Sequence, residues 1–186
     1  MHAWISAILD PLWRSAGGVV PLAVVVAVIC RYLPHRPAAR HRVAGEAGKV
    51  APVSFRVNPD VDPKTHPYIS TGLKENKFGV PITDAPALYR LAASLPNLKI
   101  TGIDCHIGSQ LTDLSPLADA ADRVLALVDA LAAEGIALHH IDLGGGVGIR
   151  YRDETPPDLE AYGRTLAARF AGRREKLLLE PGRSLV

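Results

Sequence analysis

Four short apolar segments of strand length recur between residues 50 and 186, and each ends in a polar or glycine-rich turn. The turns are Asn58–Asp60, His106–Gln110, Gly144–Gly146 and Glu180–Arg183. Segments with the 3.6-residue period of amphipathic helices separate them. Strands joined through helices by short connections run parallel, so their carboxyl ends meet on one side of the sheet. The sequence therefore predicts an α/β fold with a binding site on that side.

The predicted strands and helices alternate regularly along this part of the chain. Strands are predicted in 51–58, 99–106, 138–146 and from 176 onward, and helices in 82–96, 115–135 and 155–172. The predicted helix caps are Thr83 or Asp84, Ser115, and Thr155. The apolar residues at helical spacing predict the buried helix faces: Leu88, Leu91, Ala92 and Leu95; Leu117, Val124, Leu127, Val128 and Leu131; Leu159, Tyr162, Leu166 and Phe170.

This alternation also fits half of a (β/α)₈ barrel, which typically needs ~250 residues. The regular pattern begins only near Val50. We therefore expect an α/β fold that is a portion of such a barrel, incomplete at both ends, in a domain covering residues 48–186.

Residues 1–47 form a segment of different character. An uncharged apolar run, 17–30, precedes a basic stretch, 31–49. The run is shorter than the ~20 residues of a membrane-spanning helix and contains Pro21. Most of the positive charge follows the run, whereas in a signal peptide it precedes the apolar core. A buried or non-native segment, such as a stretch read in a shifted frame, is favoured over an uncleaved membrane anchor.

Charge and cysteine content exclude some functional classes. The formal net charge of +2 is too small to indicate a nucleic-acid partner. The two cysteines, Cys30 and Cys105, have no metal-binding spacing. These features favour free thiols in a reducing cytoplasm and predict no metal site.

Three consecutive glycines, Gly144–Gly146, end the third predicted strand. Without Cβ atoms, successive backbone N–H groups can converge on an anion such as a phosphate. A flexible turn is the alternative. The run is not a dinucleotide-binding fingerprint, because it has neither the G-x-G-x-x-G spacing nor the following acidic residue.

Two further strand ends carry candidate binding residues. Glu180 is a carboxylate at the end of an apolar strand, where it requires a partner if buried. Arg183 could form a simple surface ion pair with it. His106, followed by Ser109, is either a structural histidine or part of a site.

Four segments together resemble a known family: 56–80, 101–113, 139–151 and 177–186. They resemble the barrel domain of the diaminopimelate decarboxylase family. This family belongs to the alanine-racemase-like, fold-type III class of pyridoxal-phosphate enzymes, which also contains ornithine and arginine decarboxylases. The long segment 58–79 favours the diaminopimelate branch over the polyamine branch.

The resemblance implies a role for each candidate residue. His106 would stack on the cofactor ring, and Ser109 with the Gly144–Gly146 backbone would hold its phosphate. Glu180 would pair with the pyridine nitrogen. Pro181 and Gly182 belong to the same cofactor-binding turn, and Arg183 would contact both the phosphate and a substrate carboxylate.

The resemblance also implies the reaction and the partners. The cofactor would be pyridoxal 5'-phosphate, and the small-molecule substrate meso-diaminopimelate, decarboxylated to L-lysine. Members of the family form homodimers, and the product completes lysine biosynthesis, so the resemblance implies a cytoplasmic enzyme. From the net charge and the apolar run, we expect no nucleic-acid partner and do not favour a membrane partner.

The chain also departs from the family pattern. The family attaches its cofactor to a lysine in a Tyr-Ala-x-Lys-Ala context, and none of the six lysines here has it. The β domain that supplies the proton-donating cysteine would follow residue 186. We therefore expect no catalytic residue in this sequence and no useful decarboxylase activity from this chain alone. A non-catalytic module that binds pyridoxal phosphate and an ornithine- or arginine-type decarboxylase are the alternatives.

Overall fold

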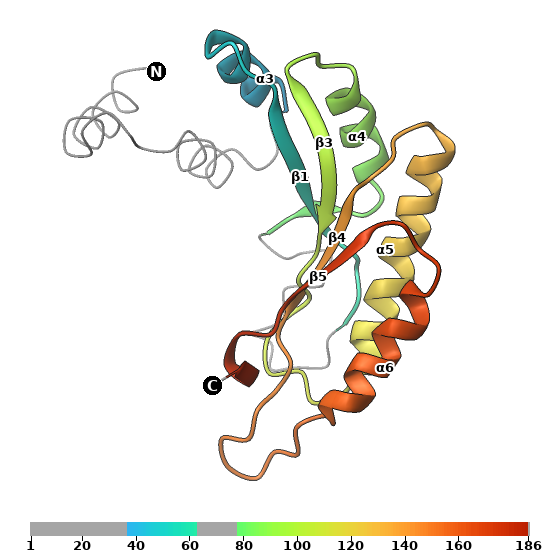
Figure 1. Cartoon of the computed structure of the whole chain (residues 1–186). Coiled ribbons are helices and arrows are strands. Elements are labelled where there is room, and N and C mark those ends of the chain that lie inside the picture. Colours follow the sequence, from blue (N-terminus) through green and yellow to red (C-terminus); the bar gives the residue numbers. More distant parts are fainter. Residues whose placement is uncertain (1–36, 63–77, 186) are drawn as a thin grey trace, which may run out of the picture. The chain divides into compact units, whose positions relative to one another are not determined.

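The computed structural model describes residues 37–62 and 78–185, which belong to one compact unit (Figure 1). The predicted apolar run 17–30, the basic residues up to Arg36 and positions 63–77 lie outside the described residues. Among the residues described, no helix is long and apolar enough to cross a membrane.

The core of this unit is a five-stranded sheet in which all neighbouring strands are parallel. Its strands lie in the order β2-β1-β3-β4-β5. Their bounds are β1 (Ala51–Asn58), β2 (Val80–Pro81), β3 (Leu98–Asp104), β4 (His140–Gly145) and β5 (Lys176–Glu180). The four predicted strands and their parallel arrangement are confirmed. The two-residue strand β2 was not predicted, because it is too short to produce a hydrophobic period.

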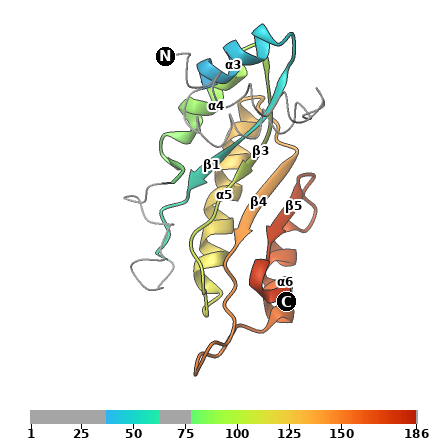
Figure 2. The same cartoon turned by 90° about the vertical axis from the view of Figure 1, so that its left-hand side faces the viewer.

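Helices connect the strands and cover one face of the sheet. They are α4 (Ala85–Ala93), α5 (Ser115–Ala133) and α6 (Leu159–Phe170). In Figure 1 all three lie on the same side of the strands, and Figure 2 shows α5 running along the sheet. An open parallel sheet with helices on one face is the arrangement expected for a portion of a (β/α)₈ barrel.

A further helix, α3 (Pro37–Glu46), precedes the sheet and was not predicted. Its Arg40 is buried, with the guanidinium carbon 5.9 Å from the centroid of the Phe55 ring. A short 3₁₀ helix, η1 (Gly182–Leu185), follows β5.

The two faces of the sheet differ because side chains alternate along each strand. In β1, Val53, Phe55 and Val57 are almost fully buried. Ser54 and Arg56, which lie between them, are only partly buried. The apolar face continues across the next two strands through Ile103, Cys105, Ile141 and Leu143.

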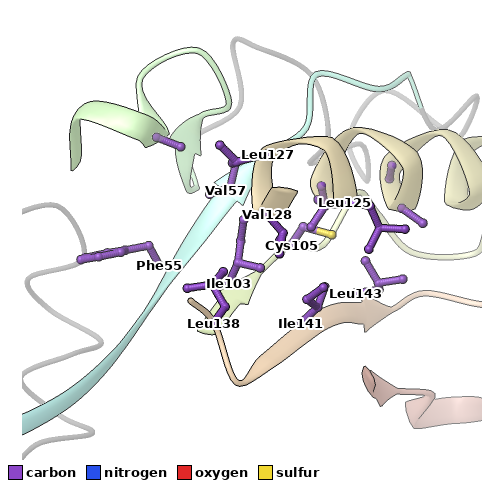
Figure 3. Packing of buried hydrophobic residues seen from close by; sticks show 14 of the residues in the cluster. Phe55, Val57, Ile103, Cys105, Leu125, Leu127, Val128, Leu138, Ile141 and Leu143 are labelled. Carbon is purple, nitrogen blue, oxygen red and sulfur yellow. The ribbon is translucent and has the colours of Figure 1, made fainter. Parts of the chain in front are cut away.

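Helix α5 packs over this apolar face. Figure 3 shows Leu125, Leu127 and Val128 of α5 among the buried residues of the strands. Every residue predicted for the buried face of this helix is buried: Leu117, Val124, Leu127, Val128 and Leu131. Removing such side chains from water is the main stabilising contribution to the fold.

The predicted buried faces of the other two helices are partly wrong. In α4, Leu91 is 47% exposed, and Tyr89 is buried in its place. The Tyr89 ring packs edge-on against Phe55 at 5.1 Å, and its hydroxyl donates to the Gly102 carbonyl oxygen at 2.8 Å. In α6, Tyr162 and Leu166 are buried as predicted, but Leu159, the first residue of the helix, is 54% exposed.

Two predicted helix caps are also corrected. Helix α6 begins after Asp158, whose carboxylate accepts the N–H groups of Glu160 and Ala161. If Thr155 were the cap, Pro156 would be the first helical residue. Pro156 precedes Pro157, and a residue before a proline disfavours helical geometry. Ser115 already lies inside α5, and the Asp113 carboxylate accepts its N–H at 2.8 Å.

Candidate functional site

The carboxyl ends of β3, β4 and β5 lie side by side and bring the predicted binding residues to one edge of the sheet. Asp104 pairs with Asp142 across β3 and β4, and Gly145 pairs with Glu180 across β4 and β5. The last residues of β4 and β5 and the turns that follow the three strands contain all the candidate residues: His106, Ser109, Gly144, Gly145, Gly146, Glu180, Pro181, Gly182 and Arg183.

The glycine run is required because the backbone of the neighbouring segments lies too close to it for side chains. Gly144 has a φ of 67°, and a Cβ there would lie 2.6 Å from the carbonyl oxygen of Cys105. A Cβ on Gly145 would collide with the Glu180 carbonyl, and one on Gly146 with the Gly108 carbonyl. The glycines therefore let the end of β4 pass closely between the ends of its two neighbours.

Two amide groups of the glycine run donate hydrogen bonds within the protein. The Gly144 N–H donates to Oδ1 of Asp142 at 2.8 Å. The Gly145 N–H donates to Nδ1 of His106 at 3.3 Å. The run therefore orients His106, a role that the sequence alone did not indicate.

The surroundings of His106 favour its neutral form. Burial lowers the pKa of its imidazole, and the nearby Arg56 guanidinium lowers it further, while Asp142 acts in the opposite direction. A neutral ring is consistent with Nδ1 accepting the Gly145 N–H. The His106 carbonyl oxygen also accepts a long hydrogen bond, 3.4 Å, from Nη2 of Arg56.

Arg56 also lies at the candidate site, although no sequence motif predicted it. It projects from β1 next to β3, and its guanidinium carbon lies 5.5 Å from the centroid of the Phe78 ring. A cation between Phe55 and Val57, two residues of a buried strand face, was the available signal. Its position on the opposite face places it beside His106.

Arg183 connects the three strand ends. One terminal nitrogen donates to the Ser109 hydroxyl, and the other donates to the Tyr151 hydroxyl at 2.7 Å. The Arg183 guanidinium carbon also lies 5.8 Å from the centroid of the Tyr151 ring. In the described residues, Arg183 does not form the ion pair with Glu180 that the sequence left open. Glu180 is exposed.

The loops after β3 and β4 are tied together beside Ser109. The Gln110 side chain donates to the Ile149 carbonyl and accepts the Ile149 N–H at 3.2 Å. The Leu111 N–H donates to the Gly146 carbonyl at 2.8 Å, and the Gly148 N–H to the Leu111 carbonyl at 2.9 Å. Gln110 adopts a φ of 60°, a conformation that these bonds stabilise. The two loops therefore form one bracket, 109–111 with 146–149.

Behind the strand ends, the same face carries a polar cluster. The Ser54 hydroxyl donates to Asp104 at 2.6 Å, and Nε2 of His140 lies 4.0 Å from the same carboxylate. Burial raises the pKa of Asp104, and the Ser54 hydrogen bond opposes this effect. On the other, apolar face, burial raises the pKa of Cys105 to about 12, which keeps this thiol protonated and unreactive at neutral pH.

These side chains fit a phosphorylated aromatic cofactor. Arg183 and Ser109 are donors suited to a phosphate. His106 offers a half-buried, uncharged ring, and Glu180 offers an acceptor for a ring N–H. Within 37–62 and 78–185, no group of three or more His, Cys, Asp or Glu side chains could hold a metal ion.

The fold is that of a family of cofactor-binding domains. The pyridoxal-binding domain of the pyridoxal-dependent decarboxylases matches residues 39–186, and the chain belongs to this family. The resemblance proposed from the sequence is therefore confirmed, and the cofactor of the family is pyridoxal phosphate.

Two curated relatives carry the name of one branch of the family. Over 145 residues the chain is 68% identical to diaminopimelate decarboxylase of Neisseria meningitidis serogroup B, a match that covers 78% of this chain and 35% of that protein. It is 61% identical to diaminopimelate decarboxylase of Pseudomonas aeruginosa, over 78% of this chain and 35% of that protein.

A solved structure gives the same result. Diaminopimelate decarboxylase from Helicobacter pylori, in a complex with L-lysine, superimposes with a TM-score of 0.77 and 40% identity over 81% of this chain and 38% of that one. The chain thus spans about a third of the length of the curated relatives that it matches.

Proposed function

We propose that this chain is the pyridoxal-phosphate-binding barrel portion of a diaminopimelate decarboxylase, an enzyme that converts meso-diaminopimelate to L-lysine. The observation that carries the proposal is the link from Arg183 to Ser109 at the end of three adjacent strands, beside His106. Relatives with 57–68% identity that bear this name support the diaminopimelate branch.

Each residue has a distinct task in this proposal. Arg183 and Ser109 bind the phosphate, a charge-assisted interaction that also fixes the orientation of the cofactor. His106 lies against the ring, and its neutral state avoids placing a second cation next to the ring N–H. Glu180 accepts that N–H and holds the proton there. The bound cofactor supplies an electron-accepting ring that lowers the barrier to loss of carbon dioxide.

Substrate recognition makes a second use of the same guanidinium. Meso-diaminopimelate carries two carboxylates, and the planar fork of Arg183 matches a carboxylate as well as a phosphate. Lysine attachment of the cofactor, proton donation and assembly into a homodimer are further features of the proposed enzyme, and a cytoplasmic location follows from its biosynthetic role.

The proposal can be tested by titrating the full chain with pyridoxal phosphate and following absorbance and calorimetric heat. We expect saturable binding that inorganic phosphate competes away. Arg183→Ala should weaken binding about tenfold to a hundredfold, the range for a hydrogen bond to a charged group. Arg174→Ala, at an exposed arginine between α6 and β5, is the matched control and should bind as the unaltered chain does. No saturable binding by the unaltered chain would overturn the proposal.

Borohydride reduction and peptide mass spectrometry then separate the enzyme from its alternatives. A single stoichiometric lysine adduct would indicate that the chain provides its own attachment site. Binding with scattered labelling of several lysines would favour a module that holds the cofactor without attaching it. Binding of ornithine to the chain loaded with pyridoxal phosphate, with no binding of meso-diaminopimelate, would favour the polyamine branch.

A further inference from the structure

Tyr151 lies at the candidate site but has no role in the function proposed above. It ends the segment that contains the glycine run, and 59% of its surface is exposed. Its hydroxyl nevertheless accepts a hydrogen bond from Arg183 at 2.7 Å, and its ring faces the same guanidinium at 5.8 Å. An exposed tyrosine with two separate contacts to one cation is well suited to fix the position of that cation.

The backbone around Tyr151 is itself held in place. The Glu154 carboxylate accepts the N–H of Tyr151 at 3.1 Å and the N–H of Arg152 at 2.8 Å. The Glu154 carbonyl accepts Nε of Arg150 at 3.2 Å. These bonds close a tight turn that presents the Tyr151 side chain.

The position of this turn relative to Ser109 is also fixed. Ile149 lies two residues before Tyr151, and its N–H and carbonyl both bond the side chain of Gln110, the residue after Ser109. Ser109 and Tyr151 are therefore connected through the bracket of 109–111 and 146–149. Arg183 reaches both hydroxyls from a third strand end.

We propose that Tyr151 is a positioning residue that holds the guanidinium of Arg183 over Ser109, ready to bind an anionic group. The anion is a phosphate or a carboxylate, and its identification as part of the cofactor or substrate rests on the proposed function. Tyr151 acts through Arg183 and does not touch the ligand itself.

The first test observes Arg183 directly and needs no ligand. Nitrogen-15 NMR of arginine side chains measures rotation about the Nε–Cζ bond, and Arg183→Lys assigns the signal by its disappearance. Loss of one hydrogen bond in Tyr151→Phe should speed this rotation about twofold to tenfold. Tyr151→Leu, which also removes the ring contact, should speed it further. Tyr162→Phe removes a phenolic hydroxyl on α6 and should leave the Arg183 signal unchanged.

The second test measures affinity for inorganic phosphate and for pyridoxal phosphate in the same variants. Tyr151→Phe should weaken both about twofold to tenfold, and Tyr162→Phe neither. Unchanged Arg183 rotation in Tyr151→Phe, or equal losses of affinity in both tyrosine variants, would overturn the inference. If the unaltered chain binds neither ligand, the proposed function fails, whereas the rotation measurement still decides the role of Tyr151.

Discussion

The two faces of the sheet are built from alternate residues of the same strands, yet they have different roles. On the helix side, Val53, Phe55 and Ile103 are at most 2% exposed. On the opposite side, Ser54, Arg56 and Asp104 form hydrogen bonds and ion contacts that lead toward His106. Adjacent residues of β1 therefore differ in role: one stabilises the core, and the next contributes to the candidate site.

The largest expected effect comes from truncating the apolar face. Phe55→Ala removes a buried ring together with its contact to Tyr89, and should lower the free energy of unfolding by about 3–5 kcal/mol. Ser54→Ala, at the preceding residue, removes the hydrogen bond to Asp104 and should cost only about 0.5–1.5 kcal/mol. Urea unfolding monitored by circular dichroism measures both, and equal losses would contradict the difference between the faces.

A smaller loss is expected where the two neighbouring strands enclose β4. Gly145→Ala would force a methyl group against the Glu180 backbone and should destabilise the fold by about 1–3 kcal/mol. At Gly163 of α6, no atom beyond its chain neighbours and the backbone of its own helix lies within 4 Å of the corresponding position. Gly163→Ala should therefore stabilise the fold by about 0.5–1 kcal/mol through helix propensity. Thermal unfolding compares the two, and changes of the same sign would refute the packing argument.

The pH dependence of stability should differ in sign between a buried and an exposed carboxylate. Burial raises the pKa of Asp104, so its proton is bound more tightly in the folded chain. The stability from this protonation is present in acid and is lost as the pH rises through the folded pKa. The hydrogen bond from Arg173 lowers the pKa of Asp129, so the stability from that group is lost as the pH falls.

Asparagine variants isolate these two contributions. As the pH rises, Asp104 should lower the free energy of unfolding, and Asp104→Asn should abolish this decrease. Asp129 should raise the free energy of unfolding, and Asp129→Asn should abolish this increase. Denaturant midpoints between about pH 3 and 7 measure both slopes. Two slopes that change in the same direction would be incompatible with the assigned environments.

The smallest effect is expected on the outer surface of α4. Leu91 was predicted to be buried but is 47% exposed, so Leu91→Ala should change the free energy of unfolding by no more than about 0.5 kcal/mol. Chemical denaturation is sufficient to test this. A loss above about 2 kcal/mol, the range for a buried leucine, would restore the original prediction.

Local patterns predicted much of the fold. The alternation of Val53, Phe55 and Val57 gave β1, and the apolar stripe of α5 was predicted residue by residue. The cap of α6 was misplaced because Thr155 and Asp158 are both good capping residues, and only the intervening prolines decide between them. Leu91 was misplaced because the spacing of α4 allowed two faces, and Phe55 of another element selects Tyr89.

The candidate site was predicted less completely, for a physical reason. The strand-end residues His106, Ser109 and Arg183 were identified from their positions, and their roles toward a cofactor remain predictions. The partners that orient them, Arg56 and Tyr151, come from distant parts of the chain. A single sequence does not reveal that Tyr151 meets a residue 32 positions later.

The bracket of 109–111 and 146–149 has a consequence for the order of folding. Gln110 is bonded to a residue 39 positions later in the chain, and Arg183 reaches Ser109 over 74 positions. Contacts with such long loops close later than the local contacts within a helix. We expect pulse-labelling hydrogen exchange to protect the α5 amides before that of Leu111, and simultaneous protection would exclude this order. The groups proposed to bind an anion would then become ordered after helix α5, and a ligand would bind a chain whose local structure has already formed.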